Sequence, residues 1–294
     1  MTEHDIIIVD AVPQQTYLDI AMSAARYALI SVAFTYNRMD KKDIRSRVIN
    51  ITKGKIAEGL LYFYGALHGI RLDHQSCTTP FWMPDHRDFL FKNGEWDLKN
   101  NFIYCSDTDF NKLSFTALPA LIPNKYGGDQ WSKRDKHYME YSRYSAYLFT
   151  FMRLRPDSKA FFDLSLTEEQ LSFLSGISQT YQNTAYSRMP FMESWFWDTI
   201  PGFMPYDFLR LNYYPELIIT GCANARYWHF FKDTGPLDSE NHYKDYGRTQ
   251  WYTTGHGQIT KFLNGTIVTT IKNKTCPVGL LPSFKSVFNQ IPEF

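Results

Sequence analysis

The 294-residue chain is poor in cysteine and has no closely spaced cysteine pair. Its four cysteines (Cys77, Cys105, Cys222 and Cys276) lie far apart, and no Cys-x-x-Cys motif occurs. A cysteine-based zinc site and a disulfide framework are therefore not indicated, and the eight histidines show no metal-ligand spacing either. We expect buried or free thiols in a reducing compartment.

The chain also lacks a large net charge and long apolar runs. It has 31 basic and 30 acidic residues, a net charge of +1, so binding to nucleic acid or membrane would have to come from local patches. No basic segment precedes the apolar run at 6–9, which is too short for a signal peptide. No stretch approaches the roughly 20 apolar residues of a membrane span. We therefore predict a cytoplasmic protein.

Hydrophobic residues make up 44% of the chain, which is enough for a large core. Aromatic residues reach 17%, and we expect most of them in that core, with base stacking as the alternative. No repeat, linker or low-complexity tract interrupts the sequence, so we predict a single domain spanning 1–294. We interpret the segment at about 156–215 as an accessory insertion, and favour core packing over base stacking for its Trp195 and Trp197.

The hydrophobic spacing predicts an α/β fold with a central mixed β-sheet flanked by helices. Helices are predicted at 13–38, about 52–69, 166–176 and 223–231, and strands within 137–155, at 217–221 and in the tail. Thr52 and Gly69 are the expected caps of the second helix, with Leu67 on its inward stripe. Glu58 lies beside that stripe, where it could reach a site at the sheet edge or be an ordinary surface residue.

The segment 88–99 has the pattern of a β-hairpin. Its central Asn-Gly pair is the strongest short-range signal for a two-residue turn, and the flanking residues alternate as in strands. Pairing outward from this turn places Asp88 opposite Lys99, and Asp97 lies two residues before Lys99 on the same face. The sequence thus predicts two carboxylates and one ammonium group together.

An Asp-x-Lys spacing occurs three times, beginning at Asp40, Asp97 and Asp157, so the spacing alone carries little information. The first lies at a predicted helix end and the third in a turn after a proline, and neither would hold the pair on a sheet face. Asp85 competes with Asp88 as the first acid, but the expected register points it to the opposite face. A β-bulge between the two would reverse that choice.

In this hairpin the chain resembles the PD-(D/E)xK nuclease superfamily, whose active site combines an acid on one strand with an Asp/Glu-x-Lys motif on the next strand. Asp88, Asp97 and Lys99 match that motif, and Glu58 fits the acid that many members supply from the preceding helix. The resemblance covers about residues 52–105 and implies a restriction-endonuclease-like core. It implies a metal-dependent endonuclease, of restriction or phage type, that hydrolyses double-stranded DNA and commonly acts as a homodimer.

The chemistry of such a site follows from its ligands. Mg²⁺, with Mn²⁺ as a substitute, prefers oxygen ligands, here the carboxylates of Asp88, Asp97 and Glu58 and the carbonyl of Leu98. The ions would lower the pKa of the attacking water, and Lys99 would orient or deprotonate that water. The predicted contacts to DNA phosphates are Arg47, Lys53 and Lys55.

Other interpretations stay open. Asp88 and Lys99 could form a simple cross-strand ion pair worth roughly 0.2–1 kcal/mol. The fold could also be a catalytically inactive DNA-binding or assembly module, or an enzyme directed at RNA. A nuclease requires Asp88 and Asp97 within metal-bridging distance and near Glu58, whereas a structural role requires Lys99 to neutralise the acids.

Overall fold

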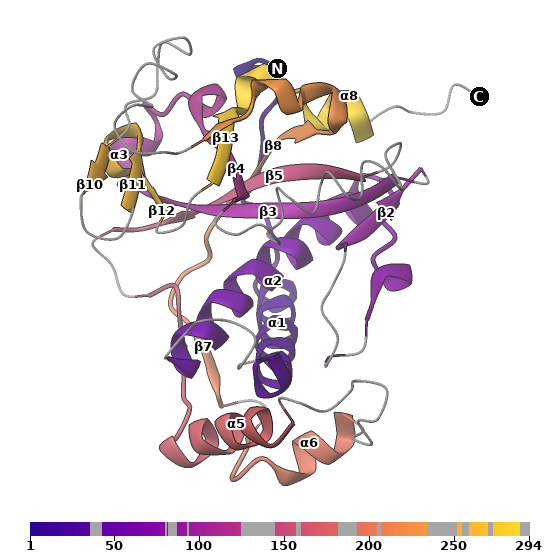
Figure 1. Cartoon of the computed structure of the whole chain (residues 1–294), viewed down its shortest axis with the longest axis vertical. Coiled ribbons are helices and arrows are strands. Elements are labelled where there is room, and N and C mark those ends of the chain that lie inside the picture. Colours follow the sequence, from indigo (N-terminus) through magenta and orange to yellow (C-terminus); the bar gives the residue numbers. More distant parts are fainter. Residues whose placement is uncertain are drawn as a thin grey trace.

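The computed structural model describes residues 1–35, 43–79, 81, 87–92, 94–124, 145–156, 160–181, 193–204, 207–233, 252–254, 259–269 and 273–288. Its centre is a five-stranded mixed sheet in the order β1-β8-β5-β3-β2 (Figure 1). The strands are β1 (Ile7–Val9), β8 (Leu217–Ala223), β5 (Ser145–Leu154), β3 (Gly94–Tyr104) and β2 (Phe89–Phe91). The predicted α/β class with a central mixed sheet is confirmed, and the restriction-endonuclease-like core stays a prediction.

The two longest strands, β3 and β5, run parallel to each other, from the pair Glu95–Ser145 to the pair Tyr104–Leu154. β2 is antiparallel to β3, and β8 is antiparallel to both β5 and β1. Successive residues of β3 point to opposite faces of the sheet. Trp96 and Leu98 belong to the core that contains the long helices, whereas Ile103 belongs to a second core on the other face.

Two long helices, α1 (Gln14–Thr35) and α2 (Ile44–Leu67), cover one face of the sheet (Figure 1). α2 begins earlier than predicted because the Asp43 carboxylate accepts hydrogen bonds from the backbone N–H groups of Arg45 and Ser46. Thr52 is therefore not the cap. It is buried within the helix, and its hydroxyl donates to the carbonyl of Val48 at 2.7 Å.

The predicted end of α2 is confirmed. Gly69 has φ of +68°, which favours glycine, and the N–H of Ile70 donates to the carbonyl of Gly65 at 2.8 Å, the pattern of a Schellman cap. Leu67, placed on the inward stripe by the sequence analysis, is 66% exposed. The last turn of α2 therefore leaves the core before the helix ends.

Short strands form a layer on the other face of the central sheet (Figure 1). β4 (Pro119–Pro123), β13 (Asn273–Pro277) and β9 (Lys232–Asp233) make one three-stranded sheet, in the order β4-β13-β9. A second contains β10 (Tyr252–Thr254), β11 (Ile259–Phe262) and β12 (Ile267–Thr269). Buried residues of β4 and β13 share the second core with Phe149 and Phe151 of β5.

Shorter elements complete the fold. The two short helices are α3 (Asp107–Phe110) and α8 (Phe284–Phe288). The 3-10 helices are η1 (Glu3–Asp5), η3 (Gln75–Cys77), η4 (Phe115–Ala117), η6 (Ala225–Phe230), η8 (Leu263–Gly265) and η9 (Val278–Leu280). The helix predicted at 223–231 is thus the 3-10 helix η6, and the strands predicted within 137–155 and at 217–221 are β5 and β8.

The segment at 156–215 holds the hairpin of β6 (Phe162–Leu164) and β7 (Leu209–Leu211), together with α5 (Glu168–Tyr181) and α6 (Glu193–Thr199). α5 begins where predicted, because Thr167 and Gln170 form a reciprocal capping box. Trp195 and Trp197 are partly buried against the core, which confirms the predicted packing role. Figure 1 shows α5 and α6 beyond the end of α1 that is remote from the central sheet.

The structure also bears on the cysteines and on membrane spans. All four cysteines are free and buried, as predicted. Contrary to the expectation that no stretch approaches a membrane span, the helical segment Gln14–Phe34 is long and apolar enough to cross one. In the fold, 61% of the most apolar 18-residue stretch of this segment is buried. A helix in a protein core can have the same length and composition, so this finding is weak evidence for a membrane span.

Candidate active site

The predicted hairpin is present, with a register shifted by two residues. Phe89 pairs with Trp96 and Phe91 pairs with Gly94, so the first strand ends at Phe91 and the second begins at Gly94. The sequence analysis placed the turn at Asn93-Gly94, and Asn93 lies outside the described residues. Lys92 has φ of +46°, the left-handed conformation that a tight turn demands. A shift of two residues preserves which face each strand residue points to.

Asp88 lies at a bulge just before β2. Its N–H donates to the carbonyl of Trp96 at 2.9 Å, although Trp96 is already paired with Phe89. Its carboxylate oxygen Oδ2 accepts a hydrogen bond from the N–H of Leu98 at 2.6 Å, and its carbonyl accepts one from the Tyr62 hydroxyl at 3.0 Å. These bonds hold the carboxylate at the edge of β3. Asp85, the competing first acid, lies outside the described residues.

Aromatic side chains support this hairpin from α8. The Phe288 ring lies 4.6 Å from the ring of Trp96 and 4.5 Å from that of Phe91, centroid to centroid, and it stacks on Phe284 at 4.4 Å. Phe89 and Phe288 are buried. The apolar side of the hairpin is therefore fixed by the last helix of the described chain.

The electrostatic surroundings of Asp88 come from α2 and β3. Burial raises the pKa of Asp88 well above its usual value, and the negative charges of Glu58 and Asp97 raise this pKa further. Lys55 and Lys99 act in the opposite direction. The charges that act on Asp88 thus come from three carboxylates and two ammonium groups in α2 and around β3, and we call these five residues the acid cluster: Glu58, Asp88, Asp97, Lys55 and Lys99.

Two ion pairs connect members of the acid cluster. The Lys99 ammonium group is within hydrogen-bond distance of the Asp97 carboxylate, and its side chain is only 12% exposed. The Lys55 Nζ lies 2.7 Å from Glu58 Oε2 and 4.8 Å from the centroid of the Tyr27 ring. Each lysine therefore offsets the charge of one acid beside Asp88.

The two ion pairs lie on opposite sides of β3. Asp97 and Lys99 alternate with Trp96 and Leu98, which face the helices, and Lys99 Nζ lies 5.4 Å from the ring of Tyr147, whose strand neighbour Phe149 is in the second core. Glu58 and Lys55 belong to α2, on the helix side. The charges of both pairs act on Asp88.

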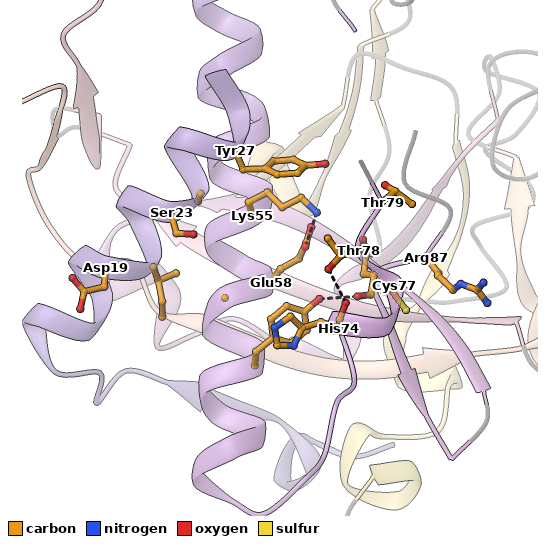
Figure 2. Close-up of a pocket in the computed structure, with 15 residues that line it drawn as sticks. Asp19, Ser23, Tyr27, Lys55, Glu58, His74, Cys77, Thr78, Thr79 and Arg87 are labelled. Atoms are coloured by element: carbon orange, nitrogen blue, oxygen red, sulfur yellow. Dashed lines mark hydrogen bonds and ion pairs between the residues drawn. The ribbon is translucent and has the colours of Figure 1, made fainter. Parts of the chain in front are cut away.

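A cavity of about 560 Å³ opens beside the helix-side pair (Figure 2). Glu58, Lys55 and Asp88 line it, and Asp97 and Lys99 are not among its lining residues. Figure 2 shows Tyr27, Lys55 and Glu58 along one wall, with His74, Cys77 and Thr78 across from them. Sequence analysis missed the contribution of residues 74–79, which carry no recognisable motif and reach the cavity only through the tertiary fold.

The three predicted phosphate contacts have different surroundings. Arg47 is 2% exposed within α2, so a role at the DNA surface does not fit its position. Lys53 is half-buried with Nζ 5.3 Å from the Phe102 ring, and burial lowers its pKa. Lys55 lines the cavity, paired with Glu58. Of the three, Lys55 is the one that belongs to the acid cluster.

The acid cluster suits a metal ion in chemistry but not in present geometry. Within the described part of the chain, no three His, Cys, Asp or Glu side chains are close enough together to hold a metal. Lys99 engages Asp97, Lys55 engages Glu58 and the Leu98 N–H engages Asp88. Carboxylates are nevertheless the ligands that Mg²⁺ prefers, and the charges that raise the pKa of Asp88 are those a divalent cation would offset.

No family model matches the chain, and neither a curated protein nor a solved structure is significantly similar to it. The resemblance to PD-(D/E)xK nucleases therefore rests on the residues of the acid cluster alone.

Proposed function

We propose that this protein is a metal-dependent endonuclease that hydrolyses phosphodiester bonds in DNA, with Mg²⁺ as cofactor and Mn²⁺ as a substitute. The observation that supports it is that Glu58 from α2 and Asp88 from the bulge before β2 line one cavity, and that the charges of Asp97 and Lys99 from β3 also act on Asp88. A simple cross-strand ion pair would need neither Glu58 nor the bulge. The resemblance adds to the proposal a restriction or phage-type role, double-stranded DNA as substrate, a homodimer and a cytoplasmic location.

In the proposed reaction, the carboxylates of Glu58 and Asp88, which line the same cavity, would hold the metal, and the resemblance adds Asp97 and the carbonyl of Leu98 as further ligands. Bound Mg²⁺ would offset the negative charge that builds up on the phosphate. The Leu98 N–H keeps the Asp88 carboxylate oriented, and the bulge keeps it at the strand edge. Binding of a cation by Asp97 would release the Lys99 ammonium group, which could then hold the attacking water.

The covalent step is an exchange of one P–O bond for another. The water oxygen bonds to phosphorus, one water proton passes to a base, and the bond from phosphorus to one sugar oxygen breaks. The leaving sugar oxygen takes up a proton to become a hydroxyl group. Lys99 would orient the water and stabilise the developing negative charge, and Lys55 would neutralise a neighbouring phosphate oxygen.

The test compares cleavage of supercoiled plasmid and of single-stranded circular DNA in Mg²⁺, Mn²⁺ and EDTA. We expect metal-dependent cutting that falls by about 10²–10⁴-fold in Asp97→Asn and in Lys99→Gln, the range for removal of an acid–base or charge-stabilising group. Glu168→Gln is the matched control, because it removes a carboxylate that is 92% exposed and lies 3.9 Å from Arg45. Equal cutting by Asp97→Asn and the control would reject the proposed site.

A second candidate function is a catalytically inactive DNA-binding or assembly module. The Lys99–Asp97 ion pair favours it, because it already neutralises one predicted metal ligand. Calorimetric titration with Mn²⁺ separates the two functions. A folded wild-type protein that binds DNA but neither binds Mn²⁺ nor cuts would replace the nuclease with this module.

A further inference from the structure

The cavity beside Glu58 and Asp88 continues into a second cavity of about 790 Å³. The two share lining residues from α1 and from the segment after η3, namely Asp19, Ser23, Tyr27, Thr78 and Thr79. We call the combined space the α1 groove. Glu58, Asp88 and Arg87 line its inner part alone, while Arg26, Phe81 and Glu193 line its outer part alone.

We propose that the α1 groove binds a single, unpaired nucleic-acid strand, so that cutting occurs at overhangs, gaps or flaps rather than within continuous duplex. This inference rests on the proposed nuclease function but changes its substrate, from the continuous duplex that a restriction-type enzyme cuts to DNA with an unpaired segment. It follows from the position of the acids, from the size of the groove and from the side chains along it.

The two acids that line the groove, Glu58 and Asp88, are approached through a confined space. Glu58 has a side chain that is 16% exposed, and one carboxylate oxygen of Asp88 is bonded to the backbone of β3. A phosphate within a duplex is fixed to a rigid double helix whose major groove alone is about 12 Å wide. Each cavity lies in the roughly 300–1,000 Å³ range of small-ligand sites. An unpaired strand can bend into such a space, whereas a base-paired strand cannot leave its partner.

The walls of the α1 groove carry groups that suit an unpaired strand. The lining includes the aromatic rings of Tyr27 and Tyr62. Lys55 Nζ lies over the Tyr27 ring and His74 stacks on the Tyr62 ring at 4.4 Å, so a base would stack on the remaining ring faces. Base stacking on such rings is tolerant of sequence. Arg87 in the inner part and Arg26 in the outer part are cations on either side of the shared residues.

The charges of the groove predict that strand binding depends on a divalent cation. The lining contains the cations Lys55, Arg87 and Arg26 and the acids Glu58, Asp88, Asp19 and Glu193, so it has no excess of positive charge. Lys55 and Arg87 are moreover already ion-paired, with Glu58 and Glu95. A cation bound at Glu58 and Asp88 would reverse that balance where the phosphate enters. We therefore expect weak strand binding in EDTA and stronger binding in Ca²⁺.

The experiment measures fluorescence anisotropy of a labelled single strand, a blunt duplex and a duplex with an overhang, in Ca²⁺ and in EDTA. Ser23→Trp fills the groove where the two cavities meet, and Ser23 is exposed, so the fold should tolerate the change. Gln15→Trp, at an exposed position of α1 outside the groove, is the matched control. Cleavage of the same substrates in Mg²⁺ is measured in parallel, and thermal melts check that both variants fold.

We expect the wild type to bind the single strand and the overhang more tightly than the blunt duplex. Ser23→Trp should weaken single-strand binding by about tenfold or more, comparable to the loss of one or two stacked bases, and Gln15→Trp should not. Equal binding of strand and duplex, or no effect of Ser23→Trp, would overturn the inference while leaving the nuclease proposal intact. Strand binding blocked by Ser23→Trp but without any cleavage would support the groove and reject the nuclease.

Discussion

The contact between α1 and α2 depends on a glycine, and this dependence can be measured. Gly59 of α2 faces Ile20 of α1, and a Cβ atom at Gly59 would lie 2.5 Å from Ile20 Cγ2. Gly54, one and a half turns earlier in the same helix, has no atom within 4 Å of the corresponding position. The same substitution to alanine should therefore have different effects at the two sites.

The magnitudes follow from two opposing contributions. Alanine in place of glycine within a helix raises the free energy of unfolding by about 0.5–1 kcal/mol. Overpacking costs about 1–3 kcal/mol, and Ile20 cannot easily turn away because a β-branched side chain in a helix strongly prefers one χ1 rotamer. Gly54→Ala should thus raise the free energy of unfolding by about 0.5–1 kcal/mol. The free energy of unfolding of Gly59→Ala should be about 1–3 kcal/mol lower than that of Gly54→Ala.

The assay is equilibrium urea unfolding of both variants, each alone and combined with Ile20→Ala. Removing the Ile20 branches should turn Gly59→Ala from a destabilising or neutral change into a stabilising one, while the effect of Gly54→Ala stays the same. If Gly59→Ala alone stabilises the protein as much as Gly54→Ala does, then the contact with Ile20 does not make a larger residue at position 59 unfavourable, and the reasoning is refuted.

Two further predictions concern buried polar groups. Thr220→Val should lower the free energy of unfolding by about 1–3 kcal/mol, because the buried Thr220 hydroxyl donates to the Phe149 carbonyl at 2.7 Å. Thr275→Val should leave the free energy of unfolding unchanged or raise it, because the buried Thr275 hydroxyl has no partner among the described residues. Similar losses in urea unfolding for the two valine variants would contradict this. Asp88→Asn keeps an oxygen for the Leu98 N–H but removes a carboxyl group whose pKa is raised in the fold, so it should raise Tm at pH 8. This gain in Tm should shrink as the pH falls toward the ordinary carboxyl pKa of 3.8, because the wild-type carboxyl group is then protonated as well. A gain that grows on acidification would show that the charge of Asp88 stabilises the fold.

Hydrophobic spacing was sufficient to predict the helices and strands that are buried along one side. It located α1, α5, β5 and β8, whose apolar residues form the cores. It misplaced the start of α2, because Asp43 and Thr52 are both good capping residues and nothing in the local sequence prefers one. The additional strand β4 was not predicted, because prolines at both of its ends are typical of loops.

The sequence likewise predicted only part of the acid cluster. Asp97 and Lys99 share a face through the two-residue period of a strand, which is a local property. The position of Asp88 depends on the bulge and on the bond to Leu98, and neither can be read from alternating residues. Arg47 was assigned to the surface from a basic stretch, but the early start of α2 turns it inward.

The aromatic support that α8 gives to the hairpin sets an order of events during synthesis of the chain. A ribosome that has just made Asp97 must add roughly 190 further residues before Phe288, which takes about 10–40 s. Until then Trp96 and Phe91 lack the Phe288 ring that covers them, and the hairpin packs only against the core that it shares with α1 and α2. The hairpin of a nascent chain therefore gains its full aromatic support only after α8 has been made, well after the hairpin itself.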